Sequence, residues 1–180
     1  MSNDKKLEDI RNRIDSLDEQ IQSLISERAK CAQDVATIKQ SIDKYVDYYR
    51  AEREAVVLRK ILDRNQGPLS DEEMARLFRE IMSACLALEE PMKIAFLGPE
   101  GTFTQSASLK HFGHSVNTVP LGAIDEVFRE VESGAANYGV VPVENSTEGV
   151  INHTLDMFLD SSLSISGEVE LRIHQHLLST

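Results

Sequence analysis

The feature that most constrains this chain is a seam of apolar residues near its N-terminus that recurs every three or four positions. The seam comprises Leu7, Ile10, Ile14, Leu17, Ile21, Leu24, Cys31, Val35 and Ile38. This alternating spacing is typical of a heptad pattern and predicts a helix over residues 7–39. At 1.5 Å per residue, such a helix is about 50 Å long. A helical domain of about ninety residues cannot bury so long a stripe alone, which indicates a partner chain.

The composition changes halfway along the chain. Residues 1–90 hold fifteen of the 19 basic residues and a single glycine, whereas residues 91–180 hold four basic residues and eight glycines. A glycine-poor, charged segment is typical of helices, and a segment rich in Gly and Pro is typical of strands and turns. Proline also disfavours helix in the residue before it. We therefore predict a multi-domain chain, with an all-α domain over 1–91 and an α/β domain over 92–180.

Two shorter helices are predicted in the first half. One runs from Ala51 to Arg64, where Asn65-Gln66-Gly67-Pro68 ends it. Ser70 and Glu73 have the spacing of a capping box and begin the next helix, whose apolar residues again recur every three or four positions.

Charge and cysteine content exclude several classes of protein. The net charge of −11 argues against nucleic-acid and anionic-membrane binding, and no stretch approaches eighteen consecutive apolar residues. Cys31 and Cys85 have neither metal-ligand spacing nor a disulfide framework. The first residues lack the apolar core of a signal peptide. We expect a reduced, cytoplasmic enzyme or binding protein with no metal and no cofactor.

Three cations of the long helix suggest a site for a small dianion. Arg28 stands where the apolar seam is interrupted, and Lys39 follows three helical turns later on the same face, about 16 Å away. Arg11 lies about 42 Å from Lys39, so it reaches the same ligand only from an antiparallel partner helix. The alternative is that Arg28 sets the register of a coiled coil and that Arg11 and Lys39 are solvated.

The first half resembles the all-α chorismate mutases. The resemblance rests on Arg11, Leu17-Asp18, Glu27-Arg28, Lys39, Arg53-Glu54 and Arg76-Leu77-Phe78. It implies an intertwined dimer of three-helix chains in which each site receives one arginine from the other protomer. It also implies a pericyclic rearrangement of chorismate to prephenate without a covalent intermediate or a metal. Catalysis there consists of holding the reactive conformer and stabilising charge on the ether oxygen.

The resemblance also implies a role for each matched residue. Arg11 of the partner and Arg28 would bind the two carboxylates, and Lys39 would donate to the ether oxygen. Glu54 would hold the ring hydroxyl, with Arg53 beside it. Three further positions, which belong to the same binding set, depart from the enteric members of the family: Arg50 replaces an aspartate, Cys85 a serine and Glu89 a glutamine.

Glu89 carries a chemical consequence. An ionised carboxylate cannot donate a hydrogen bond, so Glu89 must be protonated to take the place of a glutamine that faces the ether oxygen. The hypothesis is that mutase activity rises toward acid pH, with Lys39, Glu54 and Glu89 as the catalytic residues. The alternative is that Glu89 is an exposed residue near a helix end.

The second half alternates strands and helices, which predicts a parallel sheet with crossover helices. Strands are expected over 93–97, 116–121, 138–143, 163–165 and 168–178, and helices over 102–112, 124–131 and 150–159. Two Gly-rich turns, 98–101 and 144–149, then lie at strand C-terminal ends and helix N-termini, where such sheets bind carboxylates. The first turn lacks the pattern of a nucleotide phosphate loop.

Together these turns resemble prephenate dehydratase. The matching segments are Gly98-Pro99-Glu100-Gly101-Thr102-Phe103-Thr104, 141–149, Ser166-Gly167-Glu168-Val169 and His174-x-His176-Leu177-Leu178. The implied cleft residues are Glu100, Thr102, Phe103, Glu144, Asn145 and Ser146. His153, His174 and His176 could serve as acids, but a lone histidine is more often structural. A mutase followed by a dehydratase implies the bifunctional family that makes phenylpyruvate for phenylalanine biosynthesis.

The second domain is expected to be an incomplete, C-terminally truncated form of the family's two-lobed domain, which resembles periplasmic binding proteins. The family's Thr-Arg-Phe motif does not occur among the 180 residues, and neither does its phenylalanine-binding domain. We therefore expect mutase activity on chorismate, no dehydratase activity on prephenate and no feedback inhibition by phenylalanine. The alternative is a helical dimerisation module joined to a non-catalytic, carboxylate-binding α/β lobe.

Overall fold

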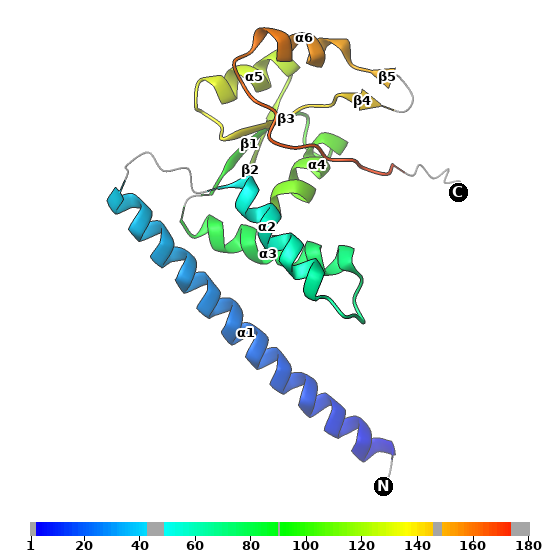
Figure 1. The fold of residues 1–180 in the computed structure, drawn as a ribbon. Coiled ribbons are helices and arrows are strands. Elements are labelled where there is room, and N and C mark those ends of the chain that lie inside the picture. Colours follow the sequence, from blue (N-terminus) through cyan, green and yellow to red (C-terminus); the bar gives the residue numbers. More distant parts are fainter. Residues whose placement is uncertain (1–2, 43–48, 90, 146–148, 174–180) are drawn as a thin grey trace, which may run out of the picture. The chain divides into compact units, whose positions relative to one another are not determined.

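The structure, a computed structural model, describes residues 3–42, 49–89, 91–145 and 149–173. The chain divides into two compact units, 1–50 and 51–180. The first unit is built on helix α1 (Asn3–Ile42), which confirms the predicted long helix and extends it at both ends (Figure 1).

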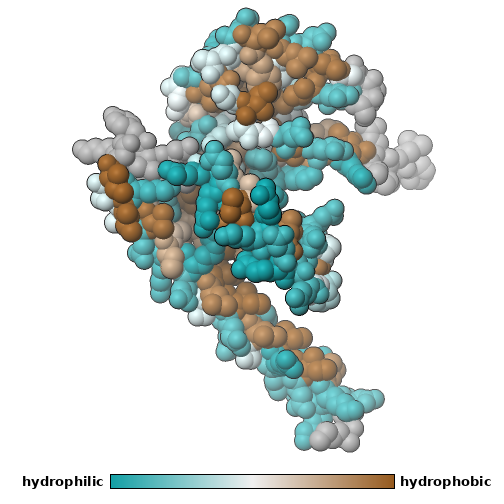
Figure 2. Space-filling model, in the orientation of Figure 1, coloured by the Kyte–Doolittle hydropathy of each residue, from teal (hydrophilic) through white to brown (hydrophobic). Residues whose placement is uncertain are grey.

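The apolar seam of α1 is exposed in the single chain. Leu7, Leu17 and Leu24 keep 48%, 47% and 64% of their surface exposed, and Figure 2 shows apolar residues along the helix. An exposed stripe of this length on one helix is a surface that another chain would cover.

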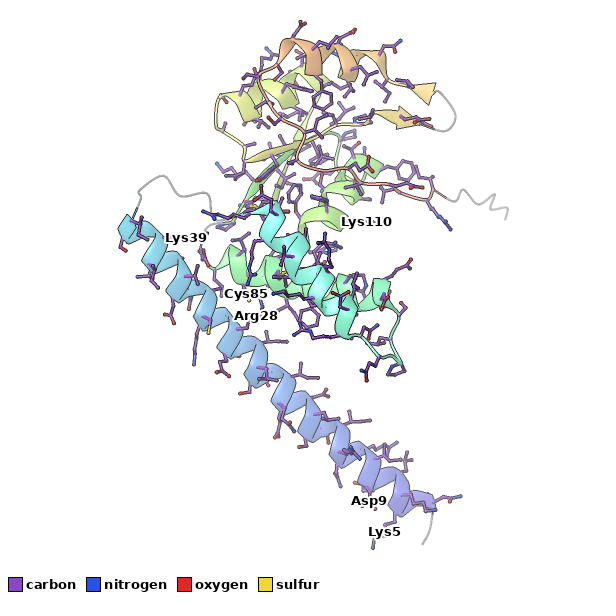
Figure 3. The ribbon with its side chains drawn as sticks, viewed as in Figure 1. Lys5, Asp9, Arg28, Lys39, Cys85 and Lys110 are labelled. Carbon is purple, nitrogen blue, oxygen red and sulfur yellow. The ribbon has the colours of Figure 1, made fainter. Side chains whose placement is uncertain are left out.

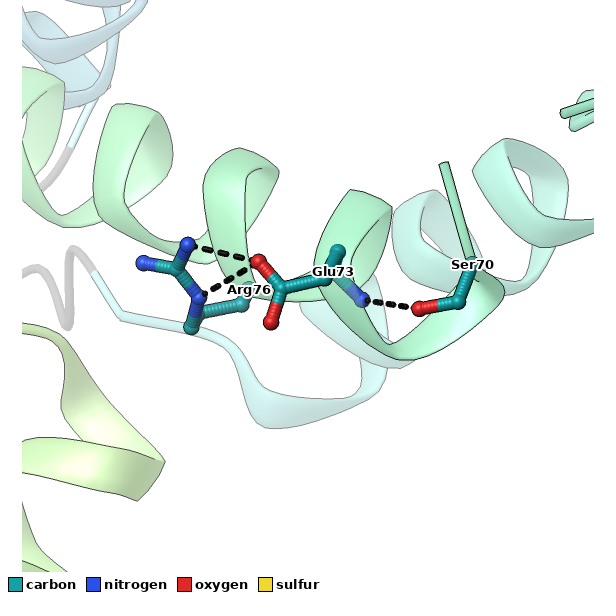
Figure 4. A network of polar contacts seen from close by, with 3 residues as sticks. All are labelled: Ser70, Glu73 and Arg76. Carbon is teal, nitrogen blue, oxygen red and sulfur yellow. Dashed lines mark hydrogen bonds and ion pairs between the residues drawn. The ribbon is translucent and has the colours of Figure 1, made fainter. Parts of the chain in front are cut away.

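The second unit begins with the helices α2 (Ala51–Arg64) and α3 (Asp71–Ala87), which lie side by side in Figure 1. Both were predicted from the sequence. The Ser70 hydroxyl accepts a hydrogen bond from the Glu73 backbone N–H at 3.3 Å, as a capping box requires. The Glu73 carboxylate does not turn back to the cap; it pairs with Arg76 at 2.7 Å (Figure 4). The capping box is therefore half formed.

A three-stranded parallel sheet follows. Its strands are β1 (Lys93–Leu97), β2 (Asn117–Leu121) and β3 (Tyr138–Val140), in the order β2-β1-β3. Helix α4 (Phe103–Phe112) connects β1 to β2, and α5 (Ile124–Glu132) connects β2 to β3. The predicted arrangement of a helical N-terminal region followed by an α/β region with a parallel sheet is confirmed.

Helices α4 and α5 cover opposite faces of this sheet. The ring of Tyr138 lies 5.2 Å from that of Phe112 on α4, whereas a Cβ on the next residue, Gly139, would lie 2.8 Å from Val127 on α5. Successive strand residues point to opposite faces, so the two helices are on different sides. Opposite faces are expected because the two right-handed crossovers, from β1 to β2 and from β2 back across to β3, run in opposite directions along the sheet.

The chain after β3 differs from the prediction. Strand β3 ends at Val140, three residues early, and a small antiparallel pair of strands, β4 (Glu144–Asn145) and β5 (Gly149–Val150), stands at the two ends of the predicted turn 144–149. Helix α6 (Asn152–Asp160) follows, and its buried Thr154 donates to the Pro142 carbonyl at 2.7 Å. This bond ties the start of α6 to the end of the β3 segment.

The strands predicted over 163–165 and 168–178 are wrong in the part that the structure describes, where residues 161–173 are irregular. We call this segment the strap. It lies against α4, where Lys110 Nζ donates to the Glu170 carbonyl at 2.7 Å. Alternating apolar residues form a strand only where a sheet edge pairs with them, and the strap bonds to a helix instead. Residues 174–178 lie outside the described residues, and the domain boundary near residue 91 stays a prediction.

The junction between α3 and α4 depends on Gly113. This residue caps α4 with φ +81° and ψ 177°, a conformation open essentially only to glycine, and a Cβ there would lie 2.5 Å from Ser83 Cβ. Gly134, which follows α5, also has a positive φ (+76°), but no atom lies within 4 Å of an added Cβ.

We expect Gly113→Ala to lower the free energy of unfolding by about 3 kcal/mol, because backbone strain and overpacking combine. The matched control Gly134→Ala has only the backbone effect and should lose about 1 kcal/mol. Urea unfolding of both variants measures the difference, and equal losses would contradict the packing of Gly113 on Ser83.

Candidate functional site

The cations predicted on α1 are placed as the helical spacing requires. Arg28 and Lys39 are partly exposed and stand three turns apart on the same helix (Figure 3), and Arg11 is exposed nearer its N-terminus. In a straight helix Arg11 is about 42 Å from Lys39, so the first unit brings Arg28 and Lys39 within reach of one small ligand but not Arg11.

The second unit places a paired carboxylate on α2. Glu54 Oε1 accepts a hydrogen bond from Arg79 Nε, on α3, at 3.4 Å. The Glu54 and Arg79 side chains are 17% and 27% exposed, so this ion pair is partly shielded from water. Its neighbours Arg50 and Arg53 are both exposed. Within the second unit, Glu54 is therefore less exposed than Arg53, the other predicted residue on α2.

The charges of this ion pair affect the pKa of His111, a histidine on α4. Burial lowers the pKa of His111, the Glu54 carboxylate acts to raise it, and the Arg79 guanidinium lowers it further, with a net value below 6.5. On its other side the ring meets the strap, where a Cβ on Gly167 would lie 3.1 Å from His111 Cε1. His111 is therefore held between the strap and the α2–α3 pair as a neutral imidazole at pH 7.

A second contact joins α3 to the α/β region. The Glu80 carboxylate accepts from the His114 backbone N–H at 3.1 Å, and its other oxygen lies 2.7 Å from His114 Nδ1. Burial acts to raise the pKa of Glu80, but the bonds from His114 outweigh it, and the pKa lies below its ordinary value. Both oxygens of Glu80 are thus committed to this junction.

The two remaining predicted mutase positions are on or just after α3. Cys85 is buried, with 3% of its surface exposed, and is labelled in Figure 3. Glu89 is partly exposed and lies in the turn after α3, where its backbone N–H donates to the Leu86 carbonyl at 3.0 Å. Their roles in binding stay predictions.

The first Gly-rich turn forms a capped helix start at the C-terminal end of β1. Thr102 Oγ1 accepts from the Gln105 backbone N–H at 3.5 Å and donates to the Leu97 carbonyl at 3.4 Å. The Gln105 side chain accepts from the Gly101 N–H at 2.6 Å and donates to Thr118 on β2 at 3.2 Å. Glu100 and Phe103 are exposed beside the turn, and Phe103 keeps 57% of its surface in solvent.

The order of the strands locates the second turn relative to the first. Neighbouring strands β1 and β3 lead into connections on opposite faces of the sheet, which makes the gap between their C-terminal ends a topological switch point. The turn 98–101 leaves β1 there, and the segment after β3 carries Glu144 and Asn145, both exposed on β4. The ligand position expected at the strand ends stays a prediction.

Several predicted residues are not part of these arrangements. His153 is exposed on α6. Ser146, His174 and His176 lie outside the described residues. Among residues that are described, no group of three or more His, Cys, Asp or Glu side chains is arranged to hold a metal ion, and no helix has the length and apolarity to cross a bilayer.

Arg79 and His111 were not singled out from the sequence. They stand 25 and 57 positions after Glu54, and no short-range spacing connects the three. The one signal in the sequence was the position of Arg79, a cation among the apolar residues of the predicted third helix, where a charged side chain needs a partner. Its partner follows only from the packing of α2 on α3.

Comparison with known proteins adds independent evidence. The family model of chorismate mutase type II matches residues 10–90, and that of prephenate dehydratase matches residues 94–180. A bifunctional chorismate mutase/prephenate dehydratase of Stutzerimonas stutzeri is 64% identical over 99% of this chain and 50% of its own length. The protein of the same description from Pseudomonas aeruginosa is 63% identical with the same coverage. The chain thus spans about half the length of the curated relatives it matches.

A solved structure of chorismate mutase (Form II) from Thermus thermophilus is 30% identical to this chain. The similarity covers 47% of this chain and 94% of that one, with a TM-score of 0.45.

We expect the His111 imidazole in the folded chain to titrate below pH 6.5, the value of an unperturbed histidine, because burial disfavours its cation. Because the unfolded chain then binds this proton more readily than the folded chain, the folded state is most favoured above pH 6.5. That stability is lost as the pH falls from 6.5 to the lower pKa of the folded state. NMR titration of the imidazole measures the pKa, and urea unfolding of wild type and His111→Gln at pH 7.5 and 5 measures the linked stability. A folded-state pKa at or above 6.5 would contradict the burial of the ring.

Proposed function

The chain belongs to the bifunctional chorismate mutase/prephenate dehydratase family, and on this premise we propose that its helical part converts chorismate to prephenate, with the α/β part as a section of a prephenate dehydratase domain. The observation that carries this proposal is that the two family matches follow one another over nearly the whole chain, at residues 10–90 and 94–180. The place of action would be the cytoplasm, in phenylalanine biosynthesis.

The proposed mutase mechanism relies on placed charges. Chorismate carries two carboxylates, and Arg28 with Arg11 of a second protomer would bind them through charge-assisted hydrogen bonds. Lys39 would donate to the ether oxygen as that bond breaks and negative charge gathers there. The reaction is intramolecular, so holding the substrate in its compact conformer supplies much of the acceleration.

Residues of α2 and α3 would complete the site. Glu54 would accept a hydrogen bond from the ring hydroxyl, and Arg53 and Arg50 would add positive charge near the carboxylates. Cys85 and Glu89 would line the site beside the ether oxygen. The contact with Arg79 supports this assignment, because it engages one oxygen of the Glu54 carboxylate and leaves the other able to accept a hydrogen bond from a hydroxyl.

We further propose that the working form is a homodimer joined through α1. The exposed seam supports this, since residues such as Ile10 and Ile21 keep 58% and 54% of their surface in solvent in the single chain. The distance between Arg11 and Lys39 along α1 supports it as well, because an antiparallel second copy would bring its Arg11 to Arg28 and Lys39.

For the α/β part we propose that the switch point between β1 and β3 binds a carboxylate of prephenate. The backbone N–H groups at the start of α4 and the side chains of Thr102, Glu144 and Asn145 would surround it. These 180 residues by themselves are not expected to release phenylpyruvate from prephenate.

The function is tested by measuring chorismate consumption and, with prephenate as substrate, phenylpyruvate release. We expect turnover of chorismate by wild type and a loss of at least about 100-fold in kcat/KM for Arg28→Ala and Lys39→Ala, because each removes charge stabilisation at the reacting dianion. Lys30→Ala, which alters an exposed lysine of the same helix, is the matched control and should stay within twofold of wild type. No turnover by an intact helical dimer would support the dimerisation module instead.

The shared site is tested by mixing two inactive variants. In a dimer of Arg11→Ala with Arg28→Ala, one site has both arginines and the other has neither. Equal refolded mixtures contain half mixed dimers, each with one intact site, so about a quarter of wild-type activity should return. Sites confined to one protomer would give no recovery.

We expect the wild-type mutase rate to rise from pH 8 to pH 5, because Glu89 must be protonated to donate a hydrogen bond to the ether oxygen. Glu89→Gln always carries that donor, so its rate should be nearly independent of pH and exceed wild type at pH 8. A wild-type profile that is flat over this range and unchanged by Glu89→Gln would overturn the role of Glu89.

A further inference from the structure

The ion pair between Glu54 and Arg79 stands at the junction of three elements. Glu54 is on α2, Arg79 is on α3, and His111 approaches from α4. The two charged side chains are largely removed from water, at 17% and 27% exposure, so each depends on the other to offset the loss of hydration.

The contact between the pair engages one oxygen only. Arg79 Nε reaches Glu54 Oε1 at 3.4 Å, the only hydrogen bond of this carboxylate within the described residues. An ionised carboxylate is an acceptor with two oxygens and about four lone-pair sites. Arg79 therefore fixes the direction of the carboxylate and leaves Oε2 able to accept a bond from a ligand hydroxyl.

His111 approaches the pair from the end of α4, which packs closely on α3: a Cβ on Gly113 would lie 2.5 Å from Ser83 Cβ and 3.6 Å from the Arg79 carbonyl oxygen. In agreement with this packing, the Glu54 carboxylate acts to raise the pKa of His111 and the Arg79 guanidinium acts to lower it. The ring packs edge-on against Phe112, with centroids 4.6 Å apart, and the strap passes over it at Gly167. Lys110, the residue before His111, anchors the strap through the Glu170 carbonyl. The position of the ring is thus set by α4 and the strap.

We propose that Arg79 and His111 are positioning residues for Glu54, through which the α/β region helps to orient the carboxylate that holds the ring hydroxyl of chorismate. This inference rests on the proposed mutase function and extends it to residues outside the predicted site. Arg79 holds one oxygen by a charge-assisted bond. His111, held by Phe112 and the strap, fixes the surface of the α/β region that faces this pair.

The proposal distinguishes positioning from simple support of the fold. A residue that acts through Glu54 loses its effect when Glu54 no longer carries an ionised carboxylate. A residue that merely stabilises the fold lowers activity by the same factor in either background. Mutant cycles that combine each substitution with Glu54→Gln separate these cases.

The experiment measures kcat and KM for chorismate with Arg79→Met, Arg79→Lys and His111→Gln, each in the wild-type and the Glu54→Gln background of the full chain. We expect Arg79→Met to lower kcat/KM by about tenfold, the size of one lost charge-assisted hydrogen bond. Arg79→Lys should recover most of that loss, and His111→Gln should lower kcat/KM by about threefold. All three effects should disappear in the Glu54→Gln background.

Two matched controls belong to the same elements. Arg76→Met removes an arginine one turn earlier on α3, whose exposed partner is Glu73, and His114→Gln alters the other histidine that contacts α3. Both should stay within twofold of wild-type kcat/KM. Urea unfolding of every variant confirms that the folded chain is assayed, and Arg79→Lys keeps the test informative if Arg79→Met does not fold.

The outcomes separate this inference from the function beneath it. No chorismate turnover by wild type would overturn the proposed function. Turnover by wild type that is unaffected by Glu54→Gln, or losses for Arg79→Met no larger than for Arg76→Met, would overturn the inference and leave the function standing. Equal losses from Arg79→Met in both backgrounds would show a structural role for Arg79 and would also overturn it.

Discussion

The constraint on which the rest of this protein depends is the apolar stripe of α1, which remains exposed in a single chain. A forty-residue helix whose seam leucines and isoleucines between positions 7 and 24 are 47% to 64% exposed is a poor monomer surface. If a second copy covers it, the same event that buries the stripe brings a distant arginine to Arg28 and Lys39. Burial of apolar surface and assembly of a dianion site would then be one process, which explains why the cations interrupt or flank the seam.

In the α/β region, the order of the parallel strands determines where a ligand site can form. Connections that leave β1 and β2 in opposite directions put α4 and α5 on opposite faces, and a gap opens where the strand order diverges. The turn after β1 is stabilised there by Thr102 and Gln105, which satisfy the first free N–H groups of α4 and the Gly101 N–H. The capped turn is therefore ordered by hydrogen bonds within the chain, at the C-terminal end of β1, where the strand order of such sheets predicts ligand binding.

The junction between α3 and the α/β region combines one close packing contact with a group of hydrogen bonds. Gly113 allows the end of α4 to approach Ser83 on α3, and Glu80 holds both the backbone and the ring of His114. Within this junction lie Glu54, Arg79 and His111. A carboxylate proposed to bind chorismate thus shares an environment with a helix of the α/β region, so the two regions are linked by contacts as well as by their order in the chain.

The sequence by itself determined the elements and the types of residue available for chemistry. The spacing of apolar residues predicted α1 and α2, Ser70 and Thr102 marked the starts of α3 and α4, and the Gly-rich turn 98–101 marked the end of β1, because these signals act within one element or one turn. The tertiary structure decided which elements meet: Glu54 with Arg79, His111 under Gly167, the early end of β3, and a strap on α4 where strands were predicted. Such contacts depend on how several surfaces pack at once, and a pattern local to one segment does not contain that information.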